Sequence, residues 1–211
     1  MIKQNITKIK ETLPNNITIL AATKTRTVDK ILEAIEAGIT IIGENYAQEA
    51  ESKYEKLKGR VKIHCIGHLQ TNKVKKAVKI FDCIQTIDSL KLAKEINKEA
   101  KKINKIMPVF IEINIAKEPN KTGCMPEDAK TLAEKISKLE NLRLEGIMTM
   151  APFLEDNEKA RPYFRQTKQI FDKLNLKELS MGMSHSYKTA IEEGATIIRL
   201  GTIIFGPRNN P

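Results

Sequence analysis

The stretch "ITILAATKTRTVDKILEAIEAG" (residues 17–38) changes its hydrophobic pattern at one point. Its first part is largely apolar and stops at Lys24, which is typical of a buried strand in a parallel sheet. The second part has the spacing of one helix face, formed by Val28, Ile31, Leu32 and Ile35. Gly38 then follows where a helix C-cap is expected. The segment therefore predicts a strand and a helix, with a lysine at the end of the strand.

The same alternation continues along the 211 residues of the chain. Apolar runs bounded by turn signals predict strands at residues 17–24, 40–45, 61–67, 83–88, 107–115, 142–150, 179–183 and 196–201. Helical periodicity lies between them, as in the segments that begin near Leu90, Ala129 and Tyr187. Alternating strands and helices require parallel pairing. Eight such units predict a closed (β/α)8 TIM barrel, with a doubly wound open sheet as the alternative.

Two further segments of the sequence add detail to this fold. The opening residues have apolar side chains at helical spacing, which predicts an extra N-terminal helix packed on the barrel through Ile2, Ile6, Ile9 and Leu13. Pro162 predicts a helix start or a kink in the weakly patterned segment 151–174. No linker, repeat or low-complexity tract interrupts the chain. We therefore expect a single domain, residues 1–211.

Composition limits the classes of function. No apolar run is long enough to cross a bilayer, and a hydrophobic content of 41% with 29% charged residues is typical of a globular protein. Cys65, Cys83 and Cys124 are too scattered for a disulfide framework or a metal site, so we expect a cytoplasmic protein without a metal. The net charge of +10 is spread over most helices, which favours a solvated surface over specific nucleic-acid binding.

Reactive groups of a βα barrel gather where the strands end. Lys24 ends the first predicted strand, so its amine is expected at the barrel mouth. Such an amine suits Schiff-base formation with an aldehyde or ketone. The alternative is a lysine that reaches toward solvent and pairs with a carboxylate such as Glu44.

The last two predicted strands end in residues suited to a phosphate. "LSMGMS" supplies Gly182 and Ser184, and "RLGTIIFG" supplies Gly201 and Thr202. Backbone N–H groups at such turns, with a hydroxyl beside them, form an anion cradle at the usual phosphate position of this fold. Turn geometry alone explains Gly182 equally well and Gly201 less well. An amine and a phosphate cradle together indicate an aldehyde that carries a phosphate.

The segments "TKTRTVDKILEAIEAG", "IIGENYAQEA", "HCIGHLQTNK", "LEGIMTM", "LSMGMS" and "IIRLGTIIFGPR" occur in the order found in one family. The chain resembles the pyridoxal phosphate homeostasis proteins, which share the barrel of alanine racemase without its second domain. The resemblance implies that Lys24 forms a Schiff base with pyridoxal 5′-phosphate and that Arg199 lies against the pyridine nitrogen. It further implies phosphate contacts from Ser184, Gly201 and Thr202, and a cofactor site lined by Asn45 and Met148.

The family implies a protein of vitamin B6 homeostasis that buffers or delivers the cofactor, with PLP-dependent apoenzymes as partners and no robust catalysis. An arginine at the ring nitrogen leaves that nitrogen unprotonated and the ring a poorer electron sink. Racemisation also needs a second base, which the relatives take from a further domain and subunit. The sequence has no room for that domain, so we expect a monomer. The alternative is a small racemase of fold type III, using Tyr187, His68 or His185.

Other functions and residues have weaker support. A phosphosugar enzyme with Lys24 as its Schiff-base residue and an RNA-binding protein rank below these two. Where the family usually has an acidic residue after "GMS", this chain has His185 and Ser186, and Ser186 could cap the next helix. Further expectations concern side chains at or near the strand ends. Glu44 and Asp88 either tie strand ends to loops or contact the cofactor. We expect His64 to be a satisfied barrel residue and His68 to line the mouth, and Arg26 could simply face solvent.

Overall fold

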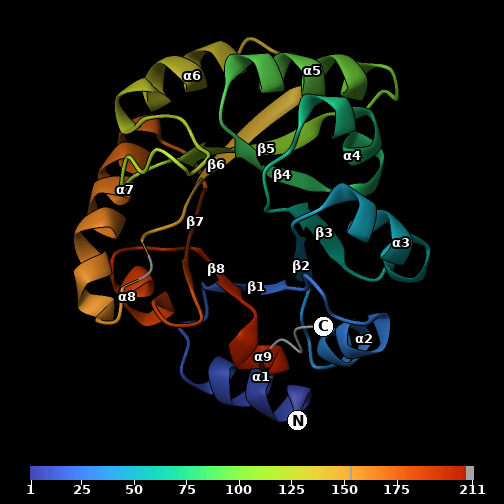
Figure 1. Cartoon of the computed structure of the whole chain (residues 1–211), viewed down its shortest axis with the longest axis vertical. Coiled ribbons are helices and arrows are strands. Elements are labelled where there is room, and N and C mark those ends of the chain that lie inside the picture. Colours follow the sequence, from blue (N-terminus) through green and yellow to red (C-terminus); the bar gives the residue numbers. More distant parts are fainter. Residues whose placement is uncertain (153, 208–211) are drawn as a thin grey trace.

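The computed structural model describes residues 1–152 and 154–207, and the expected domain's last four residues lie outside this part. Parallel strands close into one barrel in sequence order (Figure 1). The strands are β1 (Thr18–Ala22), β2 (Ile41–Glu44), β3 (Lys62–Cys65), β4 (Cys83–Ile87), β5 (Met107–Ile113), β6 (Leu142–Thr149), β7 (Glu178–Met183) and β8 (Ile197–Leu200). β1 pairs with β8, with Leu20 opposite Arg199, so the sheet has no open edge. The (β/α)8 prediction is confirmed, and the open-sheet alternative is wrong.

Helices surround this barrel on its outside (Figure 1). They are α1 (Ile2–Glu11), α2 (Val28–Glu36), α3 (Ala47–Leu57), α4 (Val74–Ile80), α5 (Leu90–Lys101), α6 (Ala129–Ile136), α7 (Arg161–Leu174), α8 (Tyr187–Glu192) and α9 (Thr202–Phe205), with 3₁₀ turns η1 (Thr71–Lys73), η2 (Pro126–Asp128) and η3 (Asn157–Ala160). α1 is the expected extra helix, and it buries Ile2, Ile6 and Ile9. Pro162 lies in the first turn of α7, where its missing N–H costs nothing.

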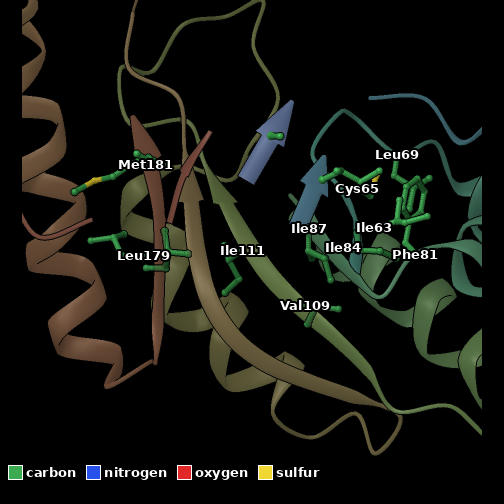
Figure 2. Close-up of a cluster of buried hydrophobic side chains, with 14 of the residues drawn as sticks. Ile63, Cys65, Leu69, Phe81, Ile84, Ile87, Val109, Ile111, Leu179 and Met181 are labelled. Carbon is green, nitrogen blue, oxygen red and sulfur yellow. The ribbon is translucent and has the colours of Figure 1, made fainter. Parts of the chain in front are cut away.

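Strand residues alternate between two apolar regions. Val109 and Ile111 of β5 and Leu179 and Met181 of β7 belong to the outer core between strands and helices (Figure 2). The intervening positions face the barrel interior, where a second cluster contains Leu20, Ile66, Cys83, Phe110, Met148 and Ile197. Every strand is therefore buried on both faces, which explains the near-continuous apolar runs of the sequence.

Two further properties concern the length of the helices and the state of the cysteines. Within residues 1–152 and 154–207, every helix is too short or too polar to cross a membrane. Cys65, Cys83 and Cys124 are buried free thiols, and burial raises the pKa of Cys65 and of Cys124 to about 12. These thiols therefore pack as small apolar side chains in a neutral form.

Candidate functional site

Lys24 lies just beyond the end of β1, at the mouth of the barrel. The Thr23 N–H donates to the Gly43 carbonyl at 2.9 Å, so the pairing of β1 with β2 continues up to the lysine. The half-buried Lys24 Nζ donates to the Tyr46 hydroxyl at 3.3 Å and lies 4.9 Å from the ring centroid. Glu44 is bonded to other groups, so the alternative pairing of Lys24 with Glu44 is wrong.

A buried set of charged groups fixes the turn that carries Lys24. Lys53 Nζ donates to the Thr23 carbonyl at 3.1 Å, to Glu44 Oε1 at 2.8 Å and to Glu49 Oε1 at 2.7 Å. Glu49 Oε1 also accepts from the Thr25 N–H at 2.6 Å, and Thr25 has a left-handed φ of 65°. Burial raises the pKa of Glu44, and the Lys53 ammonium opposes that shift. Glu44 thus ties a strand end to a loop, one of the two roles expected from the sequence.

Arg26 joins the same turn to the segment that follows β8. Its guanidinium donates to the Gly206 carbonyl at 2.5 Å and to the Pro207 carbonyl at 3.1 Å. The guanidinium carbon also lies 5.6 Å from the centroid of the Phe205 ring. Arg26 is only 7% exposed, so the expectation that it faces solvent is wrong. The two chain segments that flank the site are held together through this one side chain.

The residues expected to bind a phosphate lie on the strands next to Lys24. Ser184 follows β7, and its Oγ accepts from the Gly201 N–H at 3.3 Å. Gly201 follows β8 and lies beside Ala22, the last residue of β1. Thr202 begins the short helix α9 and is exposed. The ends of β7, β8 and β1 therefore bring the amine and the expected phosphate contacts to one side of the mouth.

Gly201 and Gly182 are glycines for different reasons. Gly182 has a φ of +88°, and a Cβ there would lie 2.5 Å from the Ala190 Cβ, so turn geometry and packing both require glycine. Gly201 has a φ of −118°, and an added Cβ would lie 3.6 Å from Ala22, an ordinary contact. Packing within the chain therefore does not require glycine at Gly201, although its ψ of −80° lies outside the usual helical and extended regions. A phosphate group at this position needs the space that a Cβ would fill. Glycine leaves that space open, so the residues fit the group.

Arg199 lies inside the barrel beneath the mouth. Its guanidinium donates to the Ser180 carbonyl at 2.8 Å, to Ser180 Oγ at 2.9 Å and to the Thr149 carbonyl at 2.7 Å. The side chain is 4% exposed, and burial lowers the pKa of Arg199 to about 10. Arg199 therefore stays charged near neutral pH, in an orientation fixed by β6 and β7. Its contact with a pyridine nitrogen remains a prediction.

The hydrogen bonds of Arg199 continue across the barrel interior. Ser180 Oγ donates to Gln85 Oε1 at 2.8 Å, and the Gln85 amide nitrogen lies 2.9 Å from His64 Nδ1. Burial lowers the pKa of His64 to about 4, so the imidazole is neutral at pH 7 and accepts from Gln85. His64 is thus a satisfied barrel residue, as expected.

Glu112 of β5 is a buried carboxyl in the same interior. Thr122 Oγ1 donates to its Oε1 at 3.0 Å, whereas Oε2 has no partner within the described part of the chain. Burial raises the pKa of Glu112 to about 7, against opposing effects of the Thr122 hydrogen bond and the Arg199 charge. The folded chain therefore favours the neutral carboxyl over the carboxylate.

We expect Glu112→Gln to raise the free energy of unfolding near pH 8 and to change it little near pH 4. The unfolded value of 4.5 lies below the folded pKa of about 7, so the unfolded chain ionises first and the wild type loses stability between these values. An amide avoids that loss, roughly 1–3 kcal/mol, and still accepts from Thr122. Urea unfolding at both pH values measures the difference. An equal effect at both would contradict the assignment.

The remaining predicted lining residues differ in exposure. Asn45 is half-buried at the mouth and lines a cavity, whereas Met148 is fully buried in the interior cluster. Their contact with a cofactor remains a prediction.

His68 Nδ1 lies 3.6 Å from Asp88 Oδ2, which places both at the mouth and ties the end of β4 to the loop after β3. In the described residues, no group of three or more His, Cys, Asp and Glu side chains could hold a metal ion.

The segment after β7 differs from the expected cap. Ser186 is the N-cap residue of α8, but its hydroxyl accepts from the Met183 N–H at 3.3 Å and caps no helical N–H. The expected side-chain cap is therefore wrong, because the turn before the helix takes the hydroxyl. Tyr187 is buried in the outer core and lines a cavity with Asn5 and Ile9 of α1. His185 is exposed.

Sequence reasoning missed Tyr46, Lys53 and Arg26. Tyr46 contacts Lys24, Lys53 fixes the turn before it, and Arg26 fixes the turn after it. Only Tyr46 had a usable signal, since it comes directly after the strand end at residues 44–45. Lys53 and Arg26 read as ordinary surface charges because their partners lie on other segments.

Comparison with known families gives consistent matches over nearly the whole chain. The family model described as alanine racemase, N-terminal domain, matches residues 1–209. The pyridoxal phosphate homeostasis protein of Aquifex aeolicus is 44% identical over 197 residues, which cover 90% of this chain and 86% of that protein. The protein of the same name from Haemophilus influenzae is 37% identical over 206 residues, covering 92% and 86%.

Solved structures agree with this result. PipY of Synechococcus elongatus with PLP bound is 31% identical, has a TM-score of 0.90, and the match covers 98% of this chain and 100% of PipY. Its structure without PLP has a TM-score of 0.93, with 32% identity and the same coverage. An alanine racemase of Clostridium difficile has a TM-score of 0.81 at 18% identity, covering 99% of this chain and 57% of the racemase, and shares the fold alone.

Proposed function

Because the chain belongs to the family of pyridoxal phosphate homeostasis proteins, we propose that it binds pyridoxal 5′-phosphate and serves vitamin B6 homeostasis. Lys24 holds the cofactor covalently as a Schiff base through Nζ. Ser184, Gly201 and Thr202 bind its phosphate, Arg199 faces its ring nitrogen, and Asn45 and Met148 line the site. When bound, the cofactor supplies a reactive aldehyde carbon. The protein supplies an amine, an anion cradle and a fixed guanidinium.

The observation that carries this proposal is the position of Gly201. Gly201 lies beside Ala22, the last residue of β1, and Ala22 precedes Lys24 by two positions. Neither the φ of Gly201 nor its packing requires glycine. A glycine that packing does not require, next to an amine and to the Ser184 hydroxyl, leaves a space that suits a phosphate. The PLP-bound structure of PipY supports the same ligand.

We further propose that the protein buffers or delivers the cofactor and has no robust catalysis of its own. Tyr187 is buried toward α1, which argues against it as a second base. Tyr46 bonds to Lys24 itself and so lies on the lysine's side. The charged Arg199 leaves the ring nitrogen unprotonated, which weakens the ring as an electron sink. We place the protein in the cytoplasm as a monomeric single barrel, with apoenzymes as its recipients and no specific nucleic-acid ligand.

Borohydride reduction of the cofactor-loaded protein tests the covalent link. The reductant converts the carbon–nitrogen double bond to a stable single bond, so peptide mass spectrometry then locates the modified side chain. We expect the pyridoxyl group on the peptide that contains Lys24. A label on another lysine, or none at all, would overturn the proposed attachment.

Chiral analysis tests the absence of robust catalysis. The alternative, a small racemase, keeps some support from His68, whose side chain is 48% exposed at the mouth. The loaded protein is incubated with single L-amino acids for a long period. We expect no steady increase of the D-isomer above the level of Lys24→Ala. A Lys24-dependent increase that His68→Ala abolishes would favour the racemase.

A further inference from the structure

A cavity with several polar side chains in its lining adjoins Lys24 on the side of β2 and β3. Its volume is about 350 Å³, and it lies between the start of α3 and the loop that leads into η1. Gly67 makes this arrangement possible, because a Cβ there would lie 2.4 Å from the Asn45 carbonyl oxygen. The two loops therefore approach more closely than any other residue type would allow. Tyr46 lines the cavity and also accepts the hydrogen bond from Lys24 Nζ.

The walls of the cavity carry donors and a positive charge. Asn45, Gln48, Gln70 and His68 line it, together with the half-buried ammonium of Lys73. No Asp or Glu is among the lining residues. The nearest carboxylates of this region bond to other groups, since Glu49 binds Lys53 and Asp88 faces His68. The lining therefore carries the positive charge of Lys73, with the Asp88 carboxylate behind His68.

These groups have few partners inside the protein. Among residues 1–152 and 154–207, no side chain bonds to the amides of Asn45, Gln48 and Gln70, and no carboxylate lies within 4.0 Å of the Lys73 ammonium. Other lysines near these loops are paired, as Lys76 is with Glu51 and Lys53 with Glu44. A ligand in the cavity would thus gain several donors without breaking a protein hydrogen bond.

We propose that this cavity is a second binding site, for the oxyanion group of a small metabolite. Its ligand is a carboxylate or a phosphate, held by the Lys73 ammonium and by the amide N–H groups of Asn45, Gln48 and Gln70. The site is separate from the proposed cofactor phosphate site, since that cradle follows β7 and β8 on the other side of Lys24. Tyr46 connects the two sites, because it lines one and contacts the lysine of the other.

Side-chain amide signals in NMR spectra of the cofactor-free full chain test the proposal. The probes are succinate and inorganic phosphate, each compared with chloride at equal ionic strength. We expect saturable shifts of the Asn45, Gln48 and Gln70 side-chain signals with one probe or both, and none with chloride. Lys73→Gln should weaken that binding about tenfold or more, since a charge-assisted hydrogen bond contributes about 1.5–3 kcal/mol.

Lys75→Gln is the matched control. It removes the same charge from the first turn of α4, two positions after Lys73, but Lys75 is exposed and does not line the cavity. We expect its affinity to stay within about twofold of wild type, because screened surface charges contribute little. Gln48→Ala, at an exposed position of α3, repeats the test from the opposite wall.

The result separates the two ligand sources and can overturn the site. Saturation by succinate alone identifies a carboxylate, and saturation by phosphate alone identifies a phosphate. Shifts that chloride reproduces, or an equal loss in Lys73→Gln and Lys75→Gln, would show only general screening and end the proposal. Asn45 also lines the proposed cofactor site, so the Gln48 and Gln70 signals, with Lys73→Gln against Lys75→Gln, decide between the second site and phosphate bound in the cofactor cradle.

Discussion

Replacing Lys24 with alanine is expected to abolish the visible absorption band of the cofactor-loaded protein while the fold is retained. The Lys24 amine is half-buried and bonds to Tyr46 alone among the described residues, so its loss removes little from folding. Lys53 cannot take its place, because its Nζ already donates to three oxygens in a buried cluster. The visible spectrum and circular dichroism of the variant are the measurements.

Lys30→Ala is the control for this variant. Lys30 is an exposed residue of α2, and its removal changes the net charge equally. We expect the band of Lys30→Ala to match that of wild type. A band retained in Lys24→Ala would mean that another amine holds the cofactor, and the proposed roles of Gly201 and Ser184 would then lose their geometric basis.

The strands were predictable because each is buried on both faces. Helices outside and side chains inside make every strand a short apolar run between turns, and the observed strands lie within or within one residue of the predicted ranges. Three helices were missed: α3, α4 and α9, of which α9 has only four residues. α3 buries Ala47, Ala50, Lys53 and Leu57, and two alanines and a lysine on the buried face make its apolar pattern weak. α4 is only seven residues long, too short for the pattern to repeat.

Part of the candidate site was predictable for a topological reason. In a parallel barrel all strands end on one face, so Lys24, Ser184 and Gly201 had to meet there once the fold was known. The groups that fix them were not predictable. Arg26 bonds to residues 206–207, about 180 positions away, and nothing near it in the sequence indicates that contact.

The hydrogen-bond partners of the polar residues in the barrel interior could not be predicted from the sequence either. The bonds from Arg199 through Ser180 and Gln85 to His64 join four strands, β8, β7, β4 and β3. His64 was expected to be a satisfied barrel residue, but its partner Gln85 and the bonds beyond it to Ser180 and Arg199 were not. Their burial is tolerated because each donor finds an acceptor, and this depends on the register between strands.

A substitution at Gly201 is expected to affect cofactor binding much more than it affects folding. Its φ of −118° is not left-handed, and an added Cβ would meet only Ala22, at 3.6 Å. The same methyl group would occupy the space between the end of β8 and the turn that carries Lys24. An added methyl group therefore competes with a phosphate there but not with the protein's own packing.

Gly201→Ala is accordingly expected to weaken retention of pyridoxal 5′-phosphate about tenfold to a hundredfold, because charge-assisted bonds to the phosphate are lost. The free energy of unfolding should fall by only about 1 kcal/mol, because alanine is a poorer N-cap residue than glycine. Equilibrium dialysis and urea unfolding measure the two quantities. Affinity for pyridoxal, which has no phosphate, should not change.

Gly182→Ala provides the opposite control. Its φ of +88° and a Cβ contact of 2.5 Å with Ala190 predict a loss of stability of about 1–3 kcal/mol, since strain and overpacking act together. If Gly201→Ala lost stability in the same way, the glycine would serve the fold. If it weakened pyridoxal and pyridoxal 5′-phosphate equally, the phosphate would lie elsewhere. Only a selective loss for the phosphorylated ligand agrees with a cradle at the end of β8.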